Sequence, residues 1–308
     1  MKTLKIYQKP LSVFLIFLFS FSLIYYYGSL GVFPIDSFLV FDSGYRFING
    51  QLPFRDIWTP FGFTLEIIQG IIFYFFGVSW NSYLLHAALF NFLISFATFV
   101  ILNKLGLKIH LALFYSLLLS VVSYPVPGSP FLDHHSIIFS IFFLYCFILH
   151  LKTNNNFYLF FCPILFVLAF LSKQTPATYI LVYTTVIGII FLVNNFSYKK
   201  ILFICLGLLF SSICFYFFFK INEISLSSFW YQYIKFPLTI GEARINSEFL
   251  FPLEFNRIIT KYKLIHISLI PLLFSIYFDF KKKSKSLFNN KDFLIKISII
   301  FFSYSLIL

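Results

Sequence analysis

The chain has 308 residues, of which 60% are hydrophobic, 23% aromatic and only 11% charged. A soluble domain carries about 25% charged residues, and its core grows too slowly with chain length to hold 49 phenylalanines. This composition excludes a soluble globular domain and predicts an all-α protein that crosses a lipid bilayer many times. The net charge of +12 does not indicate a nucleic-acid partner, because Lys and Arg stand in small groups between apolar runs.

The apolar runs predict about nine membrane spans, since a span needs roughly 20 apolar residues. The first run follows Lys2, Lys5 and Lys9 and exceeds the roughly 7–15 apolar residues of a signal peptide, so we expect an uncleaved first span. The chain stops inside the last run, which predicts either C-terminal truncation or an abrupt final helix. The expected spans are 11–30, 82–103, 109–124, 135–151, 157–172, 176–194, 201–219, 264–280 and 293–308.

A further apolar run, 62–77, contains Glu66 and Gln69 and follows Pro60. If this run does not span, the N-terminus is cytoplasmic and most other lysines join it on that side, as the positive-inside rule requires. We therefore expect an interfacial or re-entrant helix at 62–77, in a multi-pass protein of the cell membrane. The lysines that this topology places inside are Lys104, Lys108, Lys152, Lys199, Lys200, Lys281, Lys282, Lys283, Lys285 and Lys291.

The same topology gathers acidic residues on the outer side of a single transmembrane domain, 1–308. Two long outer loops, 31–81 and 220–263, hold most of them, so one interpretation is that loops simply carry polar residues. The other interpretation is a polar site that faces outward. The outer acids are Asp36, Asp42, Asp56, Glu66, Asp133, Glu223, Glu242, Glu248 and Glu254.

The first outer loop has helical periodicity over 36–48, with apolar residues on one face. Asp36 stands at the N-cap position of this expected helix, and Gly50 and Pro53 end it. A helix cap worth about 0.5–2 kcal/mol is therefore a structural explanation for Asp36. A solvated helix face is the corresponding explanation for Asp42.

This loop resembles the first outer loop of the GT-C superfamily of membrane glycosyltransferases. The similar branch is the protein-mannosyltransferase and aminoarabinose-transferase group, which includes rhizobial lipopolysaccharide transferases. The resemblance consists of Asp36 just past the first span, about fourteen residues before Gly50, then a G-x-x-P-x-R-D stretch that ends at Asp56, and Pro60. The expected interfacial helix at 62–77 also matches the membrane-parallel helices of that family.

Two later segments extend the resemblance to roughly residues 10–200. Relatives carry a second Asp where Asp133 precedes His134, and many carry a Lys-Gln pair where Lys173 precedes Gln174. The chain also departs from the family pattern, because the usual Asp-Glu pair is Asp36 followed by Ser here. The second carboxylate is thus missing, and Asp42 is the residue that could replace it.

The resemblance implies transfer of a sugar from a polyprenyl-phosphate donor to a lipid, glycan or protein acceptor at the outer face. Such a reaction needs a carboxylate base and a cation near the departing phosphate. We assign the base to Asp36 and the phosphate partner to Lys173, for which snorkelling to the interface is the structural alternative. Asp133 is expected to orient the acceptor. Further substrate-binding candidates are His134 and Gln174, with Arg46, Arg55 and Arg244 as weaker phosphate ligands.

We expect neither a metal nor another cofactor. Adjacent histidines on a helix point about 100° apart, so His134 and His135 are poorly placed to bind one ion. The four cysteines fall in apolar runs without the spacing of a metal site or a disulfide framework. The cysteines are therefore expected to be packing or lipid-facing residues.

Two alternative functions remain open. A transporter or lipid flippase places ionisable residues near the bilayer midplane, whereas the expected spans have few charges at their centres. A polymerase or ligase of surface polysaccharide usually relies on a late outer loop rich in Arg and His, and the loop 220–263 contains only Arg244 and Arg257. The gathering of acids at one rim favours chemistry at the interface.

Overall fold

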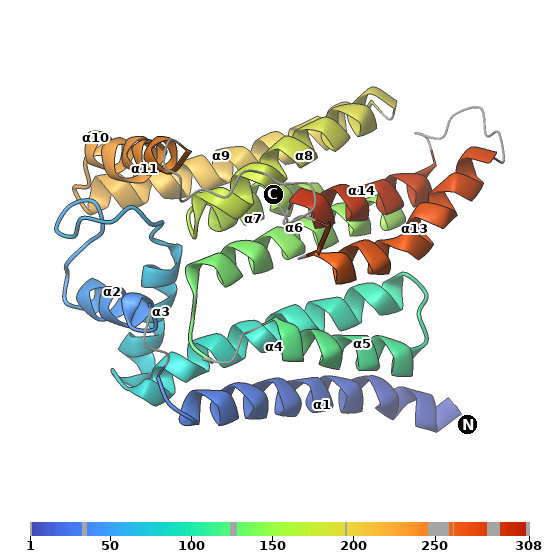
Figure 1. Cartoon of the computed structure of the whole chain (residues 1–308), viewed down its shortest axis with the longest axis horizontal. Coiled ribbons are helices and arrows are strands. Elements are labelled where there is room, and N and C mark those ends of the chain that lie inside the picture. Colours follow the sequence, from blue (N-terminus) through green and yellow to red (C-terminus); the bar gives the residue numbers. More distant parts are fainter. Residues whose placement is uncertain are drawn as a thin grey trace.

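A computed structural model describes residues 2–32, 36–123, 128–194, 196–245, 259–260, 262–281 and 290–305. Within these ranges the chain is built from helices and contains no β-strand. Most of the long helices lie roughly along one direction, with short helices across one end (Figure 1). The all-α fold expected from the composition is confirmed for this part of the chain.

Three helices form the first side of the bundle: α1 Lys2–Ser29, α4 Trp80–Lys104 and α5 Ile109–Val122. They lie side by side in Figure 1 and contact one another along their lengths. Small residues permit this close approach, since Ala87 and Ala88 of α4 are fully buried. The buried amide of Asn91 in α4 donates a hydrogen bond to the carbonyl of Ser20 at 3.3 Å, which ties α4 to α1.

The second side of the bundle contains the helices that follow. Their shared core is aliphatic and aromatic, with Leu151, Leu159, Ile180 and Leu294 among its buried residues. Pro163 lies inside α7, where Gly207 of α9 gives the two helices room to approach. The helices are α6 Leu132–Thr153, α7 Phe157–Phe170, α8 Gln174–Asn194, α9 Tyr198–Ile221, α13 Lys263–Lys281 and α14 Lys291–Ser305.

Short helices cover one end of the bundle, which we call the loop end (left in Figure 1). Glycines allow α2 to pack directly on α3: Gly44 lies against the side chain of Gln69, and Gly70 lies against the ring of Phe47. The ring of Phe41 meets that of Phe73 in the same contact, with centroids 4.9 Å apart. The elements are α2 Leu39–Ile48, α3 Thr64–Phe76, α10 Leu226–Phe229, a π-helix at Trp230–Lys235 and α11 Phe236–Ile245.

Among the helices that the structure describes, five are long and apolar enough to cross a bilayer by length and composition. Three others, α3, α5 and α7, are apolar but shorter. The protein therefore has helices suited to a membrane, while the expected nine spans and their orientation stay predictions. The five are Gln8–Ser29, Trp80–Lys104, Leu132–Thr153, Tyr198–Ile221 and Lys263–Lys281.

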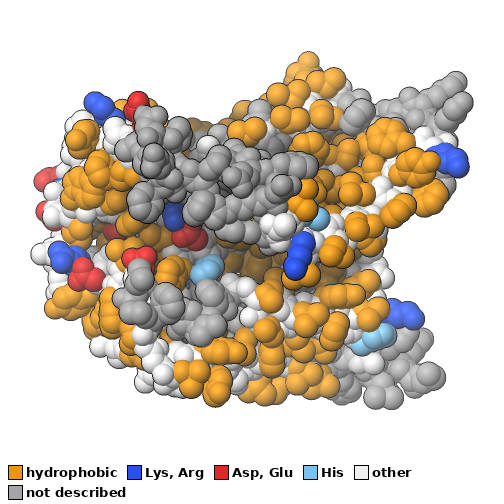
Figure 2. Space-filling view, viewed as in Figure 1, with side chains coloured by type: hydrophobic (Ala, Val, Ile, Leu, Met, Phe, Trp, Pro, Cys, Tyr) orange, Lys and Arg blue, Asp and Glu red, His pale blue; other side chains and the backbone are white. Residues whose placement is uncertain are grey.

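Charged side chains gather toward the two ends of the bundle. On the face shown in Figure 2, acidic side chains lie toward the loop end together with some Lys and Arg, and the opposite end carries Lys or Arg. We call this opposite end the lysine end; it contains the first residues of α1 and the connection from α4 to α5 (Figure 1). Several residues of the predicted charge sets lie outside the described ranges: Glu248, Glu254, Arg257, Lys282, Lys283 and Lys285.

Candidate functional site

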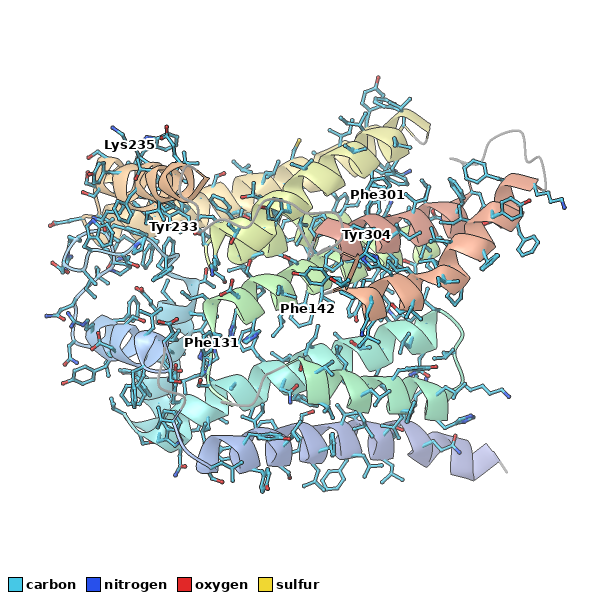
Figure 3. The ribbon with its side chains drawn as sticks, in the orientation of Figure 1. Phe131, Phe142, Tyr233, Lys235, Phe301 and Tyr304 are labelled. Atoms are coloured by element: carbon cyan, nitrogen blue, oxygen red, sulfur yellow. The ribbon has the colours of Figure 1, made fainter. Side chains whose placement is uncertain are left out.

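A small polar cavity of about 140 Å³ opens at the loop end, where the turn before α2 meets the starts of α6 and α8. Its charged lining residues are Asp36, Asp133 and Lys173. Its apolar wall includes Phe131, which precedes α6 at the end nearest α2 (Figure 3). Three residues that the sequence singled out on separate segments therefore share one cavity.

Asp36 lies in a turn and does not cap α2. Its φ of 62° is left-handed, a conformation that Asp tolerates better than most residues. Its carbonyl accepts a hydrogen bond from the Leu39 amide at 3.2 Å, so the turn closes before the helix begins. The N-cap residue is Phe38, and no side chain caps the helix. The expected N-cap role of Asp36 is therefore wrong, because α2 begins at Leu39 rather than beside Asp36.

The carboxylate of Asp36 thus remains available to the cavity. The residue is exposed, and no described residue donates a hydrogen bond to its side chain. Neighbouring Ser37 is buried, and its carbonyl accepts a hydrogen bond from the hydroxyl of Tyr83 at 2.6 Å. This bond holds the turn against α4 and leaves Asp36 at the cavity wall.

Lys173 and Asp133 form an ion pair across the cavity. The Lys173 Nζ lies 2.6 Å from Oδ1 and 2.7 Å from Oδ2 of Asp133. Asp133 sits in the first turn of α6, where the helix dipole favours a carboxylate. Lys173 precedes the N-terminus of α8, where the dipole disfavours a cation, so the Asp133 partner offsets an unfavourable position.

His134 lies beside this ion pair. It follows Asp133 on α6, and the charges of Asp133 and Lys173 both act on its imidazole. The Ser136 hydroxyl donates to the carbonyl of Lys173 at 3.2 Å, which fixes the connection between α7 and α8 against α6. Two contacts with α6 therefore fix Lys173: Asp133 pairs with its side chain, and Ser136 donates a hydrogen bond to its backbone carbonyl.

Arg46 and Asp42, also candidates from the sequence, lie away from the cavity lining. Arg46 Nε and Asp42 Oδ2 form an i,i+4 ion pair of 2.8 Å on the exposed face of α2. Such a pair contributes little to stability, about 0.3–0.5 kcal/mol. This arrangement agrees with the structural explanation considered for Asp42, a position on a solvated helix face.

Arg55 joins the two long loops. Its guanidinium pairs with Asp56 at 2.7 Å and donates to the carbonyls of Asn222 and Gly50 at 2.9 and 3.0 Å. The hydrogen bond from Arg55, together with that from the Leu52 amide, holds the pKa of the Asp56 carboxyl below its usual value. Arg55 therefore holds the loop after α2 against the end of α9.

Gln174 makes a similar connection between segments that are distant in the sequence. Its Nε2 donates to the carbonyl of Pro60 at 2.9 Å and to that of Tyr233 at 2.8 Å. The Tyr233 hydroxyl in turn donates to the Phe170 carbonyl, and Tyr233 itself is fully buried. The predicted substrate roles of Arg55 and Gln174 stay predictions, and both residues have structural partners in the protein alone.

A buried polar cluster on α3, α4 and α6 was missed by the sequence analysis. The Gln69 Oε1 and His86 Nδ1 atoms lie 2.8 Å apart, and the rings of His86 and His135 have centroids 4.8 Å apart. Glu66 is one turn before Gln69, and burial raises the pKa of its carboxyl to about 8. The polar residues within the apolar run 62–77 were a signal for this cluster, but nothing in the sequence paired them with α4.

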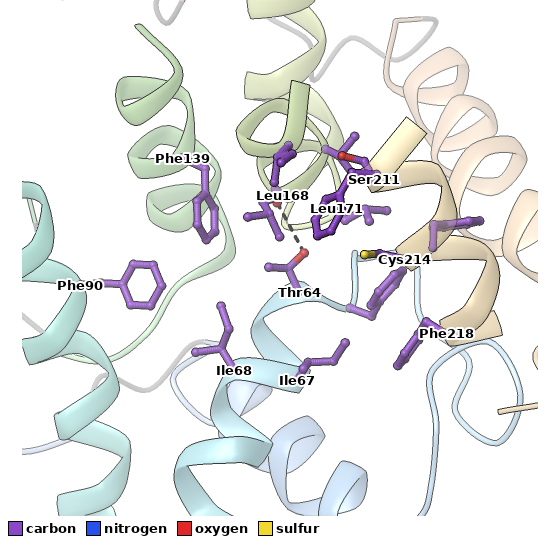
Figure 4. A pocket seen from close by; sticks show the side chains of 15 residues that line it. Thr64, Ile67, Ile68, Phe90, Phe139, Leu168, Leu171, Ser211, Cys214 and Phe218 are labelled. Atoms are coloured by element: carbon purple, nitrogen blue, oxygen red, sulfur yellow. Dashed lines mark hydrogen bonds between the residues drawn. The ribbon is translucent and has the colours of Figure 1, made fainter. Parts of the chain in front are cut away.

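A larger cavity of about 540 Å³ lies between α3, α6, α7 and α9 (Figure 4). Its walls are almost entirely apolar, with Ile67, Phe139 and Leu168 among them. The hydroxyl of Thr64 donates to the carbonyl of Leu168 at 3.4 Å, which removes a polar group from the lining (Figure 4). This cavity suits hydrocarbon rather than a polar ligand.

The segment 61–64 borders both cavities. Phe61 lines the polar cavity, whereas Phe63 and Thr64 line the apolar one. Between them, Gly62 touches the backbone of Leu171 so closely that a Cβ atom would fall on its carbonyl oxygen. The Thr64 amide donates to that same carbonyl at 3.1 Å. A head group and an apolar tail bound in the two cavities would meet at this crossing.

Comparison with family models, with curated proteins and with solved structures found no match for the chain. Among the residues that the structure describes, no group of three or more His, Cys, Asp or Glu could hold a metal ion.

Proposed function

We propose that the protein is a membrane glycosyltransferase, which moves a sugar from a polyprenyl-phosphate donor to an acceptor at the outer face of the membrane. The supporting observation is that Asp36 and Lys173 line one cavity at the loop end of an apolar helical bundle. A carboxylate and an ammonium at one small site are the two groups that this reaction requires.

Asp36 acts as the general base. The acceptor hydroxyl or amine attacks the anomeric carbon and gives its proton to the Asp36 carboxylate as the new bond forms. The bond between the anomeric carbon and the phosphate oxygen breaks, and its electron pair leaves with the lipid phosphate. General-base catalysis of this kind contributes about 10²–10⁴-fold in rate.

Lys173 stabilises the phosphate that leaves. An ammonium has three N–H donors, so Lys173 can keep Asp133 as a partner while it donates to a phosphate oxygen. Asp133 holds the ammonium at the cavity wall, since both of its oxygens lie within 2.7 Å of Nζ. The negative charge that develops on the phosphate then meets a cation already in place, which is the arrangement that lowers a barrier most.

The apolar cavity accommodates part of the donor's hydrocarbon chain. It lies across the segment 61–64 from the polar cavity, and its lining is apolar except at Thr64 and Ser211, with the thiol of Cys214. A lipid-linked substrate joins a charged phosphate to a long apolar chain, so it needs two such spaces in contact. Free sugars or nucleotide-linked sugars would leave the apolar cavity without a role.

A transporter or flippase is the second candidate function, and the buried polar cluster favours it. Glu66, Gln69 and His86 are each at most 5% exposed and lie within apolar helices. Polar and ionisable groups at such positions in membrane proteins often mark a substrate or ion path. This function predicts movement of a lipid-linked sugar between leaflets without breakage of the sugar–phosphate bond.

The test is transfer by the purified full chain in liposomes with a panel of radiolabelled polyprenyl-phosphate sugars and a membrane extract as acceptor. Asp36→Asn should lower transfer by at least about a hundredfold. The matched control is Glu242→Gln, which neutralises an exposed acid at the loop end outside the cavity. Equal transfer by Asp36→Asn and wild type would overturn the mechanism, and leaflet exchange without transfer would favour the transporter.

A further inference from the structure

A second polar pocket lies at the lysine end, far along the bundle from the proposed catalytic cavity. Its volume is about 420 Å³, and it forms where the last turn of α6 meets the first turn of α14. Leu151 and Ile295 give it an apolar base, and Lys152, Asn290, Lys291 and Asp292 give it a polar rim. Neither the proposed transfer reaction nor the transporter alternative uses this pocket.

Positive charge is concentrated at this pocket and is only partly balanced. The Nζ of Lys291 donates to the Asn154 side chain at 2.5 Å, a neutral partner that leaves its charge in place. The Lys200 ammonium of α9 lies near enough to Lys291 for the two charges to repel. Among the described residues, no carboxylate lies within ion-pair distance of Lys152 or Lys291. In the described lining of the pocket, two lysines, Lys152 and Lys291, thus face one acid, Asp292.

The lysine end offers a direct comparison with a cation that is balanced. Lys296, one turn further along α14 than Asp292, pairs with Asp279 of α13 at 2.6 Å. In the described part of the chain, the lysine that lies deeper between helices thus has a carboxylate within ion-pair distance, and Lys291 at the pocket does not. An anion from outside the chain would balance the charge of Lys291 in the way that Asp279 balances the charge of Lys296.

Position at the end of apolar helices suggests which anion this is. Leu151 and Ile295 form the floor of the pocket, and the neighbouring helices present large exposed apolar side chains along their length. The ends of apolar helices lie at headgroup depth in a bilayer, where basic pockets between helices bind anionic lipids.

We propose that this pocket binds the phosphodiester headgroup of an anionic phospholipid. Lys152 and Lys291 contact the phosphate oxygens, Lys200 adds long-range attraction, and the acyl chains follow the apolar surface beside the floor. The bound lipid would connect α6, α9 and α14, three helices that are far apart in the sequence. The assignment is independent of the proposed transfer reaction, because the two sites are at opposite ends of the bundle.

Native mass spectrometry of the purified full chain can test this proposal, with phosphatidylglycerol, phosphatidylcholine or inorganic phosphate added in separate arms. We expect retention of phosphatidylglycerol in preference to phosphatidylcholine. Lys152→Gln/Lys291→Gln should weaken that binding by about 25-fold, from about fivefold for each lysine. The control pair Lys108→Gln/Lys281→Gln removes two exposed cations of the lysine end outside the pocket and should leave binding unchanged.

Three results would overturn the proposal: equal retention of the two lipids by the wild type, equal losses in the two double variants, or inorganic phosphate that binds as tightly as phosphatidylglycerol. The last result would assign the pocket to free phosphate. If the pocket double variant does not fold, Lys152→Gln alone serves, because Lys152 is exposed and should still weaken binding by about fivefold.

Discussion

The two cavities at the loop end share a border but differ in almost every physical property. The polar cavity is small and carries three charged residues, Asp36, Asp133 and Lys173. The apolar cavity is nearly four times larger, about 540 against 140 Å³, and has no charged lining residue. A single short segment, 61–64, contributes to both. The polar and apolar cavities are therefore separated by one short stretch of backbone, whose residues line one cavity or the other, rather than by separate domains.

The difference also explains why charge is tolerated here. Both partners of the Lys173–Asp133 pair keep contact with solvent, with 28% and 46% of their side chains exposed, so neither pays the full cost of desolvation. The apolar cavity needs no such partner, because hydrocarbon fills it without hydrogen bonds. A ligand that spans both spaces would be oriented by this contrast alone.

The largest effect is expected from a methyl group at the border itself. In Gly62→Ala, the new Cβ would collide with the Leu171 carbonyl, which is backbone and cannot rotate away. We expect destabilisation of about 3 kcal/mol or more, because the loop must separate from the α7–α8 connection. The measurement is the melting temperature and the yield of folded protein in detergent.

Gly188→Ala in α8 is the matched control for this prediction, since nothing lies within 4 Å of a Cβ there. The control should be neutral or stabilising by up to about 1 kcal/mol, as expected when Ala replaces Gly inside a helix. Equal melting temperatures for Gly62→Ala and wild type would mean that the two cavities do not meet at a tight backbone crossing.

Removal of the cation should have the next largest effect, and only on chemistry. Lys173→Ala is expected to lower the rate of sugar transfer by about 10²–10³-fold, as loss of a preorganised donor to a developing oxyanion does. Lys235→Ala, which removes an exposed lysine of the loop end (Figure 3), should leave the rate unchanged. Steady-state transfer at saturating donor would measure both.

The partner of Lys173 sharpens the same prediction. If Asp133 mainly holds the ammonium, Asp133→Asn should lower the rate less than Lys173→Ala, and the double variant should resemble Lys173→Ala. A double variant that recovers wild-type transfer would show that the pair only balances its own charges.

The sequence predicted this cavity better than it predicted the contacts around it. Asp36 and Asp133 were selected because their segments resemble those of a glycosyltransferase family, and Lys173 because a lysine at that helix end has few structural explanations. The structure brings the three residues to one cavity. The predicted start of this helix was wrong, because hydrophobic periodicity does not reveal a left-handed turn at Asp36.

Contacts between distant segments were out of reach for a physical reason. Gln174 donates to Pro60, 114 residues away, and Gln69 meets His86 on another helix. Such pairs depend on which faces of two helices meet, and periodicity gives the face of each helix without its partner. The five helices long enough to span a bilayer were predicted, since their apolar runs are local properties.

The third prediction concerns the face of α3 that turns away from the apolar cavity. Ile67 and Ile68 line that cavity, whereas Glu66 lies in the buried polar cluster with a carboxyl pKa raised to about 8 from an ordinary 4.5. The folded state keeps this proton between those values while the unfolded state loses it. Stability should therefore fall as the pH rises from about 4.5 to about 8 and then level off.

Glu66→Gln keeps the shape of the neutral acid and removes its titration. Thermal unfolding in nanodiscs across this pH range should show a smaller decline for Glu66→Gln than for wild type, with similar stability near pH 4.5. Identical pH profiles for the two proteins would mean that Glu66 is ionised and solvated in the folded protein.

The smallest effect is expected at Asp42, the residue that the sequence offered as a second carboxylate. Asp42 pairs with Arg46 on the outer face of α2, and its side chain is 57% exposed and absent from the cavity lining. Asp42→Asn should therefore lower stability by no more than about 0.5 kcal/mol and leave transfer within about twofold of wild type. Transfer lowered as strongly as in Asp36→Asn would place a second carboxylate in the reaction. That outcome would require α2 to turn its exposed face toward the cavity when substrate binds, and the contrast between one polar and one apolar cavity would then describe the free protein only.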